Sequence, residues 1–148
     1  MSETAVIEEI SHGSTDYWAV LGWRDRIPRR PLGMTLTEAD TAGEESQRHF
    51  VLRKGDVLLA GVIALPQESG TVRLRQMWVR ADAAGQGHGR LLLAGVERIF
   101  NKEGFHRMIL NARIIVRGFY EKCGYTAEGP EFEEVGIPHI RMSRRIGK

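Results

Sequence analysis

Three glycines at alternate positions, Gly85, Gly87 and Gly89, separate two hydrophobic patterns, and this change constrains the fold more than any other feature. Before them, Val72–Val79 has the two-residue period of a β-strand, with Val72, Leu74, Gln76 and Trp78 expected on one face. After them the period is that of an amphipathic helix ending near Gly104. Its apolar stripe is Leu92, Leu93, Val96, Ile99 and Phe100, and we expect Arg90, Glu97, Arg98, Asn101 and Lys102 to face away.

Shorter segments on both sides predict a mixed α/β domain with a largely antiparallel sheet. Ala5–Ile10 reads as an edge strand, and Tyr17–Ile27 as a helix that Pro28 and Pro31 end. A hairpin is expected from Arg48–Arg53 and Val57–Leu65, and the second strand is apolar on both faces, as central strands are. Downstream we expect strands at Met108–Ala112, Tyr125–Glu128 and Ile137–Ser143, and a short helix at Val116–Lys122.

The composition narrows the class of protein. The 148 residues suit one domain, predicted to span 1–148. The acidic start does not resemble a signal peptide and no apolar run is long enough to cross a membrane, so we expect a cytoplasmic protein. A net charge of +2 gives no argument for nucleic acid. The single cysteine, Cys123, is more typical of a buried structural residue than of a nucleophile, and five scattered histidines predict no metal site.

The glycine turn itself predicts an anion site. The start of a helix leaves backbone N–H groups without partners and carries partial positive charge. Most helices satisfy this end with a short polar side chain, but Gly85–Gly89 offers none, and glycine lets a bulky anion such as pyrophosphate approach the amides. A Rossmann fingerprint would need glycine where Arg90 stands, and the P-loop pattern is absent. A glycine turn without a ligand remains the alternative.

Three strings together resemble the GNAT N-acetyltransferase superfamily. The loop pattern [QR]-x-x-G-x-[GA] falls on Ala84, Gly87 and Gly89, with Ala84 departing at the first position. Leu110–Arg113 followed by Phe119–Tyr125 is similar to the family string L-N-A-R…F-Y-E-K-x-G-[FY], although Ile114–Val116 between them departs from it. Glu131–Met142 is similar to the end of a subgroup of small bacterial GNAT proteins of unassigned substrate.

This resemblance implies a sheet of about six to seven strands flanked by helices, and acetyl transfer from acetyl-CoA to a primary amine by direct attack. It implies that the backbone of Met77, Trp78 and Val79 polarises the thioester carbonyl and pairs with pantetheine. Tyr120 takes the place of the general acid that protonates the thiolate, and Asn111 holds the coenzyme or a water. Coenzyme contacts are also implied for the loop residues Ala84, Gly85, Gln86, Gly87, His88, Gly89 and Arg90. Aromatic packing for Tyr120 and a turn role for Asn111 are the alternatives.

The attacking amine must lose a proton, because an alkyl amine with a pKa of about 10.4 is almost fully protonated at pH 7. Glu133, Glu134 and His139 are candidate bases, directly or through water, and we expect His139 to be the catalytic one. A histidine that is simply hydrogen-bonded within a strand is the alternative. The acceptor can be a small molecule or a peptide amine, and the family makes a homodimer plausible. A catalytically silent CoA-binding sensor or interaction module is the second hypothesis; a nucleic-acid module using Arg141–Arg145 is the third.

Overall fold

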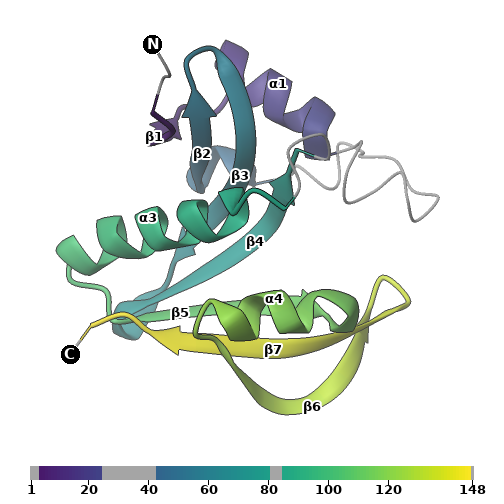
Figure 1. Cartoon of the computed structure of the whole chain (residues 1–148). Helices are drawn as coiled ribbons and strands as arrows, with labels where there is room; N and C mark the ends of the chain where they lie inside the picture. The colour runs from purple at the N-terminus through teal and green to yellow at the C-terminus, as the bar shows by residue number, and fades with distance from the viewer. Residues whose placement is uncertain (1–3, 25–42, 81–84, 148) are drawn as a thin grey trace.

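The computed structural model describes residues 4–24, 43–80 and 85–147. Within these ranges, seven strands form one sheet in the order β1-β2-β3-β4-β5-β7-β6 (Figure 1). The strands are β1 (Val6–Ile10), β2 (Arg48–Lys54), β3 (Val57–Pro66), β4 (Thr71–Val79), β5 (Arg107–Arg113), β6 (Thr126–Glu134) and β7 (Ile137–Arg145). Neighbouring strands are antiparallel except β4 and β5, which are parallel. The predicted α/β fold class, edge strand and hairpin are confirmed.

Helices cover both faces of the sheet. α3 (His88–Lys102) and α4 (Arg117–Lys122) lie on one face, and α1 (Thr15–Arg24) lies on the other (Figure 1). Three short 3-10 helices, η3 (Glu44–Ser46), η4 (Glu68–Gly70) and η6 (Ile114–Val116), connect these elements. The sequence prediction for the chain from residue 25 to 42, including Pro28 and Pro31, lies outside the described residues.

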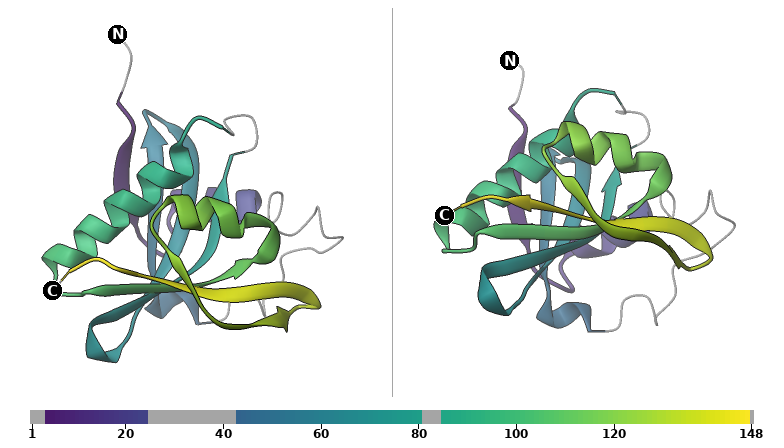
Figure 2. Two further views of the ribbon diagram at one scale, coloured as in Figure 1. Left: turned by 60° about the horizontal axis from the view of Figure 1, so that its bottom comes forward. Right: turned by 90° about the horizontal axis from the view of Figure 1, so that it is seen from below.

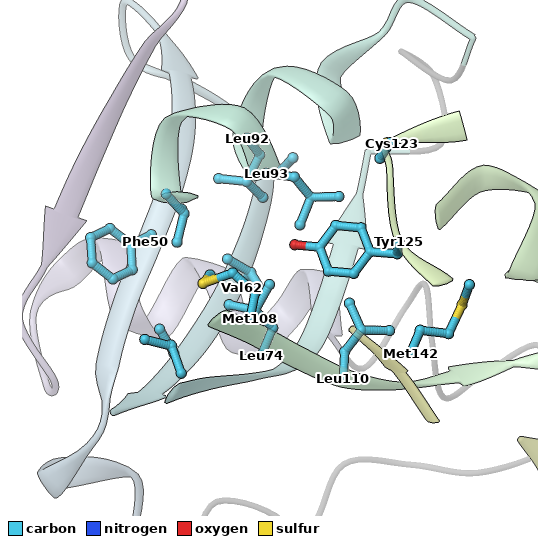
Figure 3. Packing of buried hydrophobic residues seen from close by; sticks show 14 of the residues in the cluster. Phe50, Val62, Leu74, Leu92, Leu93, Met108, Leu110, Cys123, Tyr125 and Met142 are labelled. Carbon is cyan, nitrogen blue, oxygen red and sulfur yellow. The ribbon is translucent and has the colours of Figure 1, made fainter. Parts of the chain in front are cut away.

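Two buried clusters correspond to the two faces. The larger packs the apolar stripe of α3, including Leu92, Leu93 and Phe100, onto the sheet. Figure 3 shows Leu92 and Leu93 directed from α3 toward the strands. The smaller joins α1 to β4 and includes Tyr17, Val20 and Trp78. None of the helices in the described parts of the chain is both long and apolar enough to cross a membrane.

One prediction about α3 is wrong. Glu97 was expected to face solvent, but only 7% of it is exposed. Its carboxylate accepts hydrogen bonds from the Tyr125 hydroxyl at 2.7 Å and from Arg144 at 3.0 Å. Glu97 follows Leu93 by four residues and so shares its helical face. Its place on the apolar face of α3 therefore explains why Glu97 is buried. Tyr125 and Arg144 replace the hydrogen bonds to water that its carboxylate loses on burial.

β6 is also longer than expected, because it continues to Glu134 rather than ending at Glu128. A tight turn at Val135 and Gly136, both with positive φ, reverses the chain into β7. The register of β6 against β7 shifts between Glu128 and Phe132. Pro130 lies inside this stretch and has no backbone N–H to donate to a strand, and the irregular register on an edge strand accommodates it.

Candidate active site

The glycine turn forms the start of α3 with open space in front of it. Gly85 and Gly87 both have φ of 79°, a conformation that favours glycine, and a Cβ at either would meet no atom within 4 Å. Gly87 caps the helix without any side-chain hydrogen bond, and the first bond of the helix runs from Leu91 N to Gly87 O. The amides of His88, Gly89 and Arg90 therefore have no partner within the helix, which is the arrangement that binds anions at helix starts.

Gly89 brings this helix start against two other elements. A Cβ on Gly89 would lie 2.9 Å from Cζ of Phe119 in α4, 3.1 Å from Cε of Met77 and 3.3 Å from Cγ2 of Val79, both in β4. The distance to Phe119 is shorter than real Cβ contacts show and the other two are tighter than most, so any larger residue here would require its neighbours to shift. The glycine turn, the end of β4 and the start of α4 therefore meet at one place. These are three of the segments that the sequence singled out.

β4 carries a bulge at Gln76, whose φ is 54°. On one side Arg75 pairs with Ile63 of β3, and on the other Trp78 pairs with Gly61, so β4 has an extra residue there. β4 pairs with β5 only from Thr71 to Leu74. Figure 2 shows the two halves of the sheet, β1–β4 and β5–β7–β6, diverging from that pairing. The backbone of Met77–Val79 lies beyond the last residue of β4 that pairs with β5.

The bulge corrects the predicted orientation of Trp78. Strict alternation placed Trp78 on the same face as Val72 and Leu74, but those two belong to the α3 cluster and Trp78 belongs to the α1 cluster. The extra residue at Gln76 reverses the alternation, so that Met77 and Val79 pack toward α3 instead. The Trp78 indole stacks on Trp23 with ring centroids 6.0 Å apart. Any contact of Trp78 with a ligand on the α3 face must use its backbone.

Tyr120 points from α4 toward the bulge. Its hydroxyl donates to the sulfur of Met77 at 3.5 Å, and its ring packs edge-on against Phe119 and Tyr125. Burial raises the pKa of the Tyr120 phenol to about 12. The phenol is therefore fully protonated at neutral pH and can donate a proton. Tyr120 and Met77 are 43 residues apart in sequence, yet the structure brings them together.

Asn111 and His139 lie in a different group of contacts. Asn111 in β5 donates to Glu134 at 3.4 Å, and His139 Nε2 lies 3.5 Å from the same carboxylate. His139 Nδ1 is 2.7 Å from the Ile137 carbonyl, and its ring stacks on Phe132. His139 is only 5% exposed. Its polar contacts run to Ile137 and Glu134, not to Tyr120 or Met77. Glu133 is exposed on β6.

A buried polar network on the α1 side was not predicted. Arg24 donates to both oxygens of Glu44 at 2.7 Å each, and the Tyr17 hydroxyl donates to Glu44 at 2.9 Å. His49 Nε2 lies 2.9 Å from the Glu44 backbone carbonyl. Arg24 and Glu44 are 0% exposed. Tyr17, Val20 and Arg24 are spaced i, i+3, i+7 and share one face of α1, but nothing local to Arg24 indicates that Glu44, 20 residues away, is its partner.

Electrostatics hold the network in defined charge states. Burial alone would raise the pKa of the Glu44 carboxyl, but the hydrogen bonds and charge of Arg24, with the Tyr17 hydrogen bond, bring it below its usual value. Burial raises the pKa of Tyr17 to about 12, and burial lowers the pKa of His49. At neutral pH, Glu44 is therefore ionised, Tyr17 is protonated and His49 is neutral.

Two further sequence predictions concern Cys123 and metals. Cys123 is a free, buried thiol packed beside Tyr125, and burial raises its pKa, so it remains a thiol. This confirms its predicted structural position. Across the described ranges, no three His, Cys, Asp or Glu residues are grouped to hold a metal ion. Ala84, the first position of the loop pattern, lies outside the described residues.

Comparisons with known proteins agree with this arrangement. The family model for the acetyltransferase (GNAT) domain matches residues 34–146. The acetyltransferase candidate BSU40680 of Bacillus subtilis is 36% identical over 115 residues, which cover 78% of this chain and 77% of the relative. The crystal structure of Escherichia coli ElaA superposes with a TM-score of 0.79 at 21% identity, covering 95% of this chain and 99% of ElaA. A Bacillus subtilis acetyltransferase in complex with CoA superposes with a TM-score of 0.72 at 16% identity, covering 96% and 99%. The chain belongs to the GNAT acetyltransferase family.

Proposed function

We propose that the protein transfers an acetyl group from acetyl-CoA to a primary amine by direct attack. The observation that carries this proposal is the convergence of three elements at Gly89. They are the start of α3, the end of β4 that no longer pairs with β5, and α4, which carries Tyr120. A coenzyme held there would place its pyrophosphate at the helix and its thioester near the bulge. The solved relative in complex with CoA has the same fold, which supports this assignment.

The residues present fit a pyrophosphate. The amides of His88, Gly89 and Arg90 lack partners within α3, and nothing lies within 4 Å of a Cβ at Gly85 or Gly87. A pyrophosphate gains from these dipoles and needs no basic side chain at the first loop position, where Ala84 stands. Gln86 and Arg90 are exposed and close enough in sequence to add side-chain contacts.

Two parts of the chain would perform the chemistry. Acetyl-CoA supplies a thioester carbonyl that an amine can attack and a thiolate that can leave. The backbone N–H groups of Met77–Val79, unpaired to β5 beyond Leu74, can stabilise the negative charge that develops on the carbonyl oxygen. Tyr120, protonated and directed at Met77, can give its proton to the leaving sulfur. Asn111 would hold the coenzyme or a water, as the family resemblance implies.

Thermal unfolding with two ligands tests the coenzyme site. Acetyl-CoA at 100 times its Kd stabilises a protein by about 2.7 kcal/mol through mass action, which raises the Tm. Acetyl-pantetheine, which lacks the pyrophosphate, should give a much smaller shift at the same concentration. No shift with millimolar acetyl-CoA contradicts the coenzyme site, and equal shifts contradict the role of the glycine turn.

The alternative of a catalytically silent CoA-binding module has one specific feature in its favour. Ile115, in the stretch that departs from the family string, is 84% exposed and lies just before the Tyr120 helix. Acetyl-CoA binding without transfer to any amine would support that alternative. A cytoplasmic location, a homodimer and a single domain over the full chain remain predictions.

A further inference from the structure

A small pocket lies between α1, β2 and β4, on the face of the sheet opposite α3. It is lined by Arg24, His49, Gln76 and Trp78 together with apolar side chains, and it has room for water. We call it the α1-side pocket. Three of its lining residues are almost fully buried and carry a polar atom without a hydrogen-bond partner among the described residues: Arg24 Nε, His49 Nδ1 and Trp78 Nε1. Leaving such an atom unpaired costs about 1–3 kcal/mol, so a polar molecule in the pocket would be stabilising.

The hydrogen bond of His49 fixes which of its nitrogens can accept a proton. Its Nε2 lies 2.9 Å from the Glu44 carbonyl oxygen, and a carbonyl can only accept, so Nε2 carries the hydrogen. Nδ1 therefore has a free lone pair. The indole Nε1 of Trp78 and the guanidinium Nε of Arg24 are donors. The pocket thus offers one acceptor and two donors, which suits water.

The surroundings of His49 keep it neutral. Burial lowers its pKa, and the charged or titratable groups that face it are Glu44 from η3, Arg24 and Tyr17 from α1, and His12 from the segment after β1. The Glu44 carboxylate is already held by both terminal nitrogens of Arg24. On β4, the neighbouring Arg75 donates to Gln47. Nothing described therefore competes for Nδ1.

The position of the pocket relates it to Tyr120. Gln76, the bulge residue, lines the pocket, and Met77, the next residue, receives the hydrogen bond of Tyr120 on the opposite face. One bulge therefore separates a neutral base from a protonated acid. Burial moves the two pKa values apart, with Tyr120 raised and His49 lowered. Such opposed pairs are typical of acid and base assignments in active sites.

We propose that His49 accepts the proton of the acceptor amine through a water in the α1-side pocket, while Tyr120 protonates the departing thiolate from the other face. This inference rests on the proposed acetyl transfer. His49 replaces Glu133, Glu134 and His139 as the proton acceptor, acting through water rather than by touching the amine.

The protons balance as follows. The ammonium group gives one proton to a water held by the Trp78 N–H, and that water gives one of its own protons to His49 Nδ1, which later releases it to solvent. The neutral amine forms the new C–N bond, and the C–S bond breaks with its electron pair on sulfur. Tyr120 gives its proton to that sulfur. The second proton of the amine leaves as the nitrogen becomes an amide, and it restores the Tyr120 phenol.

His49→Gln tests the inference, because a glutamine amide can still donate to the Glu44 carbonyl but cannot accept a proton at neutral pH. With an amine that the wild type acetylates, kcat/KM should fall by roughly 100-fold or more, while the Tm shift with acetyl-CoA stays unchanged. His106→Gln, which removes an imidazole outside the pocket, should keep the wild-type rate. The ratio of wild-type to His49→Gln kcat/KM, in which the amine's own ionisation cancels, should fall as the pH drops through the pKa of His49, which burial lowers, since a protonated His49 cannot act.

Two further measurements keep the inference falsifiable if His49→Gln does not fold. Trp78→Phe removes the donor proposed to hold the water and should lower kcat/KM roughly 10-fold without changing the acetyl-CoA shift. In the wild type, the ¹⁵N spectrum of the His49 imidazole should show hydrogen on Nε2 alone at pH 7; hydrogen on Nδ1 overturns the inference. A wild type that transfers acetyl to no amine removes the proposed function and this inference together. Transfer within threefold of wild type by His49→Gln removes the inference alone.

Discussion

Two buried glutamates, one on each side of the sheet, have similar partners but opposite properties. Glu44 on the α1 side and Glu97 on the α3 side each accept a hydrogen bond from a tyrosine and from an arginine. The pKa of Glu44 is lowered, whereas burial raises the pKa of Glu97. Arg24 binds both oxygens of Glu44 and is fully buried, but Arg144 gives Glu97 a single bond and is 41% exposed. The pKa of a buried carboxyl group is therefore lowered only where its charge-assisted bonds outweigh its desolvation.

The two sides of the sheet therefore have different roles. The α3 side is an apolar core with one weakly paired charge, and it supports the glycine turn and Tyr120. The α1 side holds a fixed polar network against the back of the bulge. Substitutions on the two sides should therefore affect different properties, stability in one case and rate in the other.

Arg24→Met should have the largest effect on stability. It leaves the Glu44 carboxylate buried without its partner, and breaking such a pair costs about 3–5 kcal/mol. Arg144→Met is the matched variant on the α3 side and should cost about 1 kcal/mol, since that arginine is partly solvated. Urea unfolding of both measures the difference. Equal losses contradict the contrast between the two glutamates.

Tyr120→Phe should affect the rate rather than the fold. Of the three tyrosines in the chain, Tyr17 and Tyr125 hold the buried glutamates, whereas Tyr120 donates only weakly to Met77. We expect turnover to fall roughly 10- to 1000-fold with little change in acetyl-CoA affinity or Tm, which is typical of losing a general acid. Steady-state kinetics check this, with Tyr125→Phe as the variant that should lose stability instead. An unchanged rate removes Tyr120 from the mechanism.

Gly89→Ala should have a smaller effect, in the range of about 1–3 kcal/mol that over-packing produces. The added Cβ must displace Phe119 and Met77 and so disturb the contact of Tyr120. Gly118→Ala in α4 is the control, since a Cβ there meets no atom within 4 Å and alanine favours a helix. Thermal unfolding and acetyl-CoA titration of both variants would test this. A Gly89→Ala protein with the wild-type Tm and affinity would show that the close approach is not required.

The pH dependence of stability should give the smallest but most diagnostic effect. The lowered pKa of Glu44 means that its contribution is present above the unfolded pKa near 4.5 and is lost as the pH falls through the folded pKa. The raised pKa of Glu97 means that its contribution is present at low pH and is lost as the pH rises above 4.5 through the folded pKa. The stability difference between wild type and Glu44→Gln should therefore increase with pH, and that for Glu97→Gln should decrease. Changes of the same sign would contradict the comparison.

The sequence predicted the α3 side well because its signals are local. Glycine spacing, the apolar stripe and the F-Y-E-K string each lie within a few residues, and the described strands and helices match them. The bulge at Gln76 was missed because it arises from register against β3, which no local pattern encodes. That one extra residue moved Trp78 to the other face.

The α1 side was missed for a different reason. Arg24, Glu44 and His49 come from three elements, and each alone reads as a surface residue. Only the folded chain brings them together and makes their burial favourable. Glu97 was misassigned in the same way, because its partners Tyr125 and Arg144 are 28 and 47 residues away.

An acceptor panel that follows the release of the CoA thiol tests the central claim most directly. The protein is mixed with acetyl-CoA and, in turn, with small amines, polyamines, aminoglycosides and peptides that carry lysine or a free N-terminus. We predict that at least one primary amine raises thiol release above hydrolysis in a saturable way and is recovered as its N-acetyl product. Binding of acetyl-CoA without acceleration by any of these amines would contradict the enzyme and favour a CoA-binding module instead.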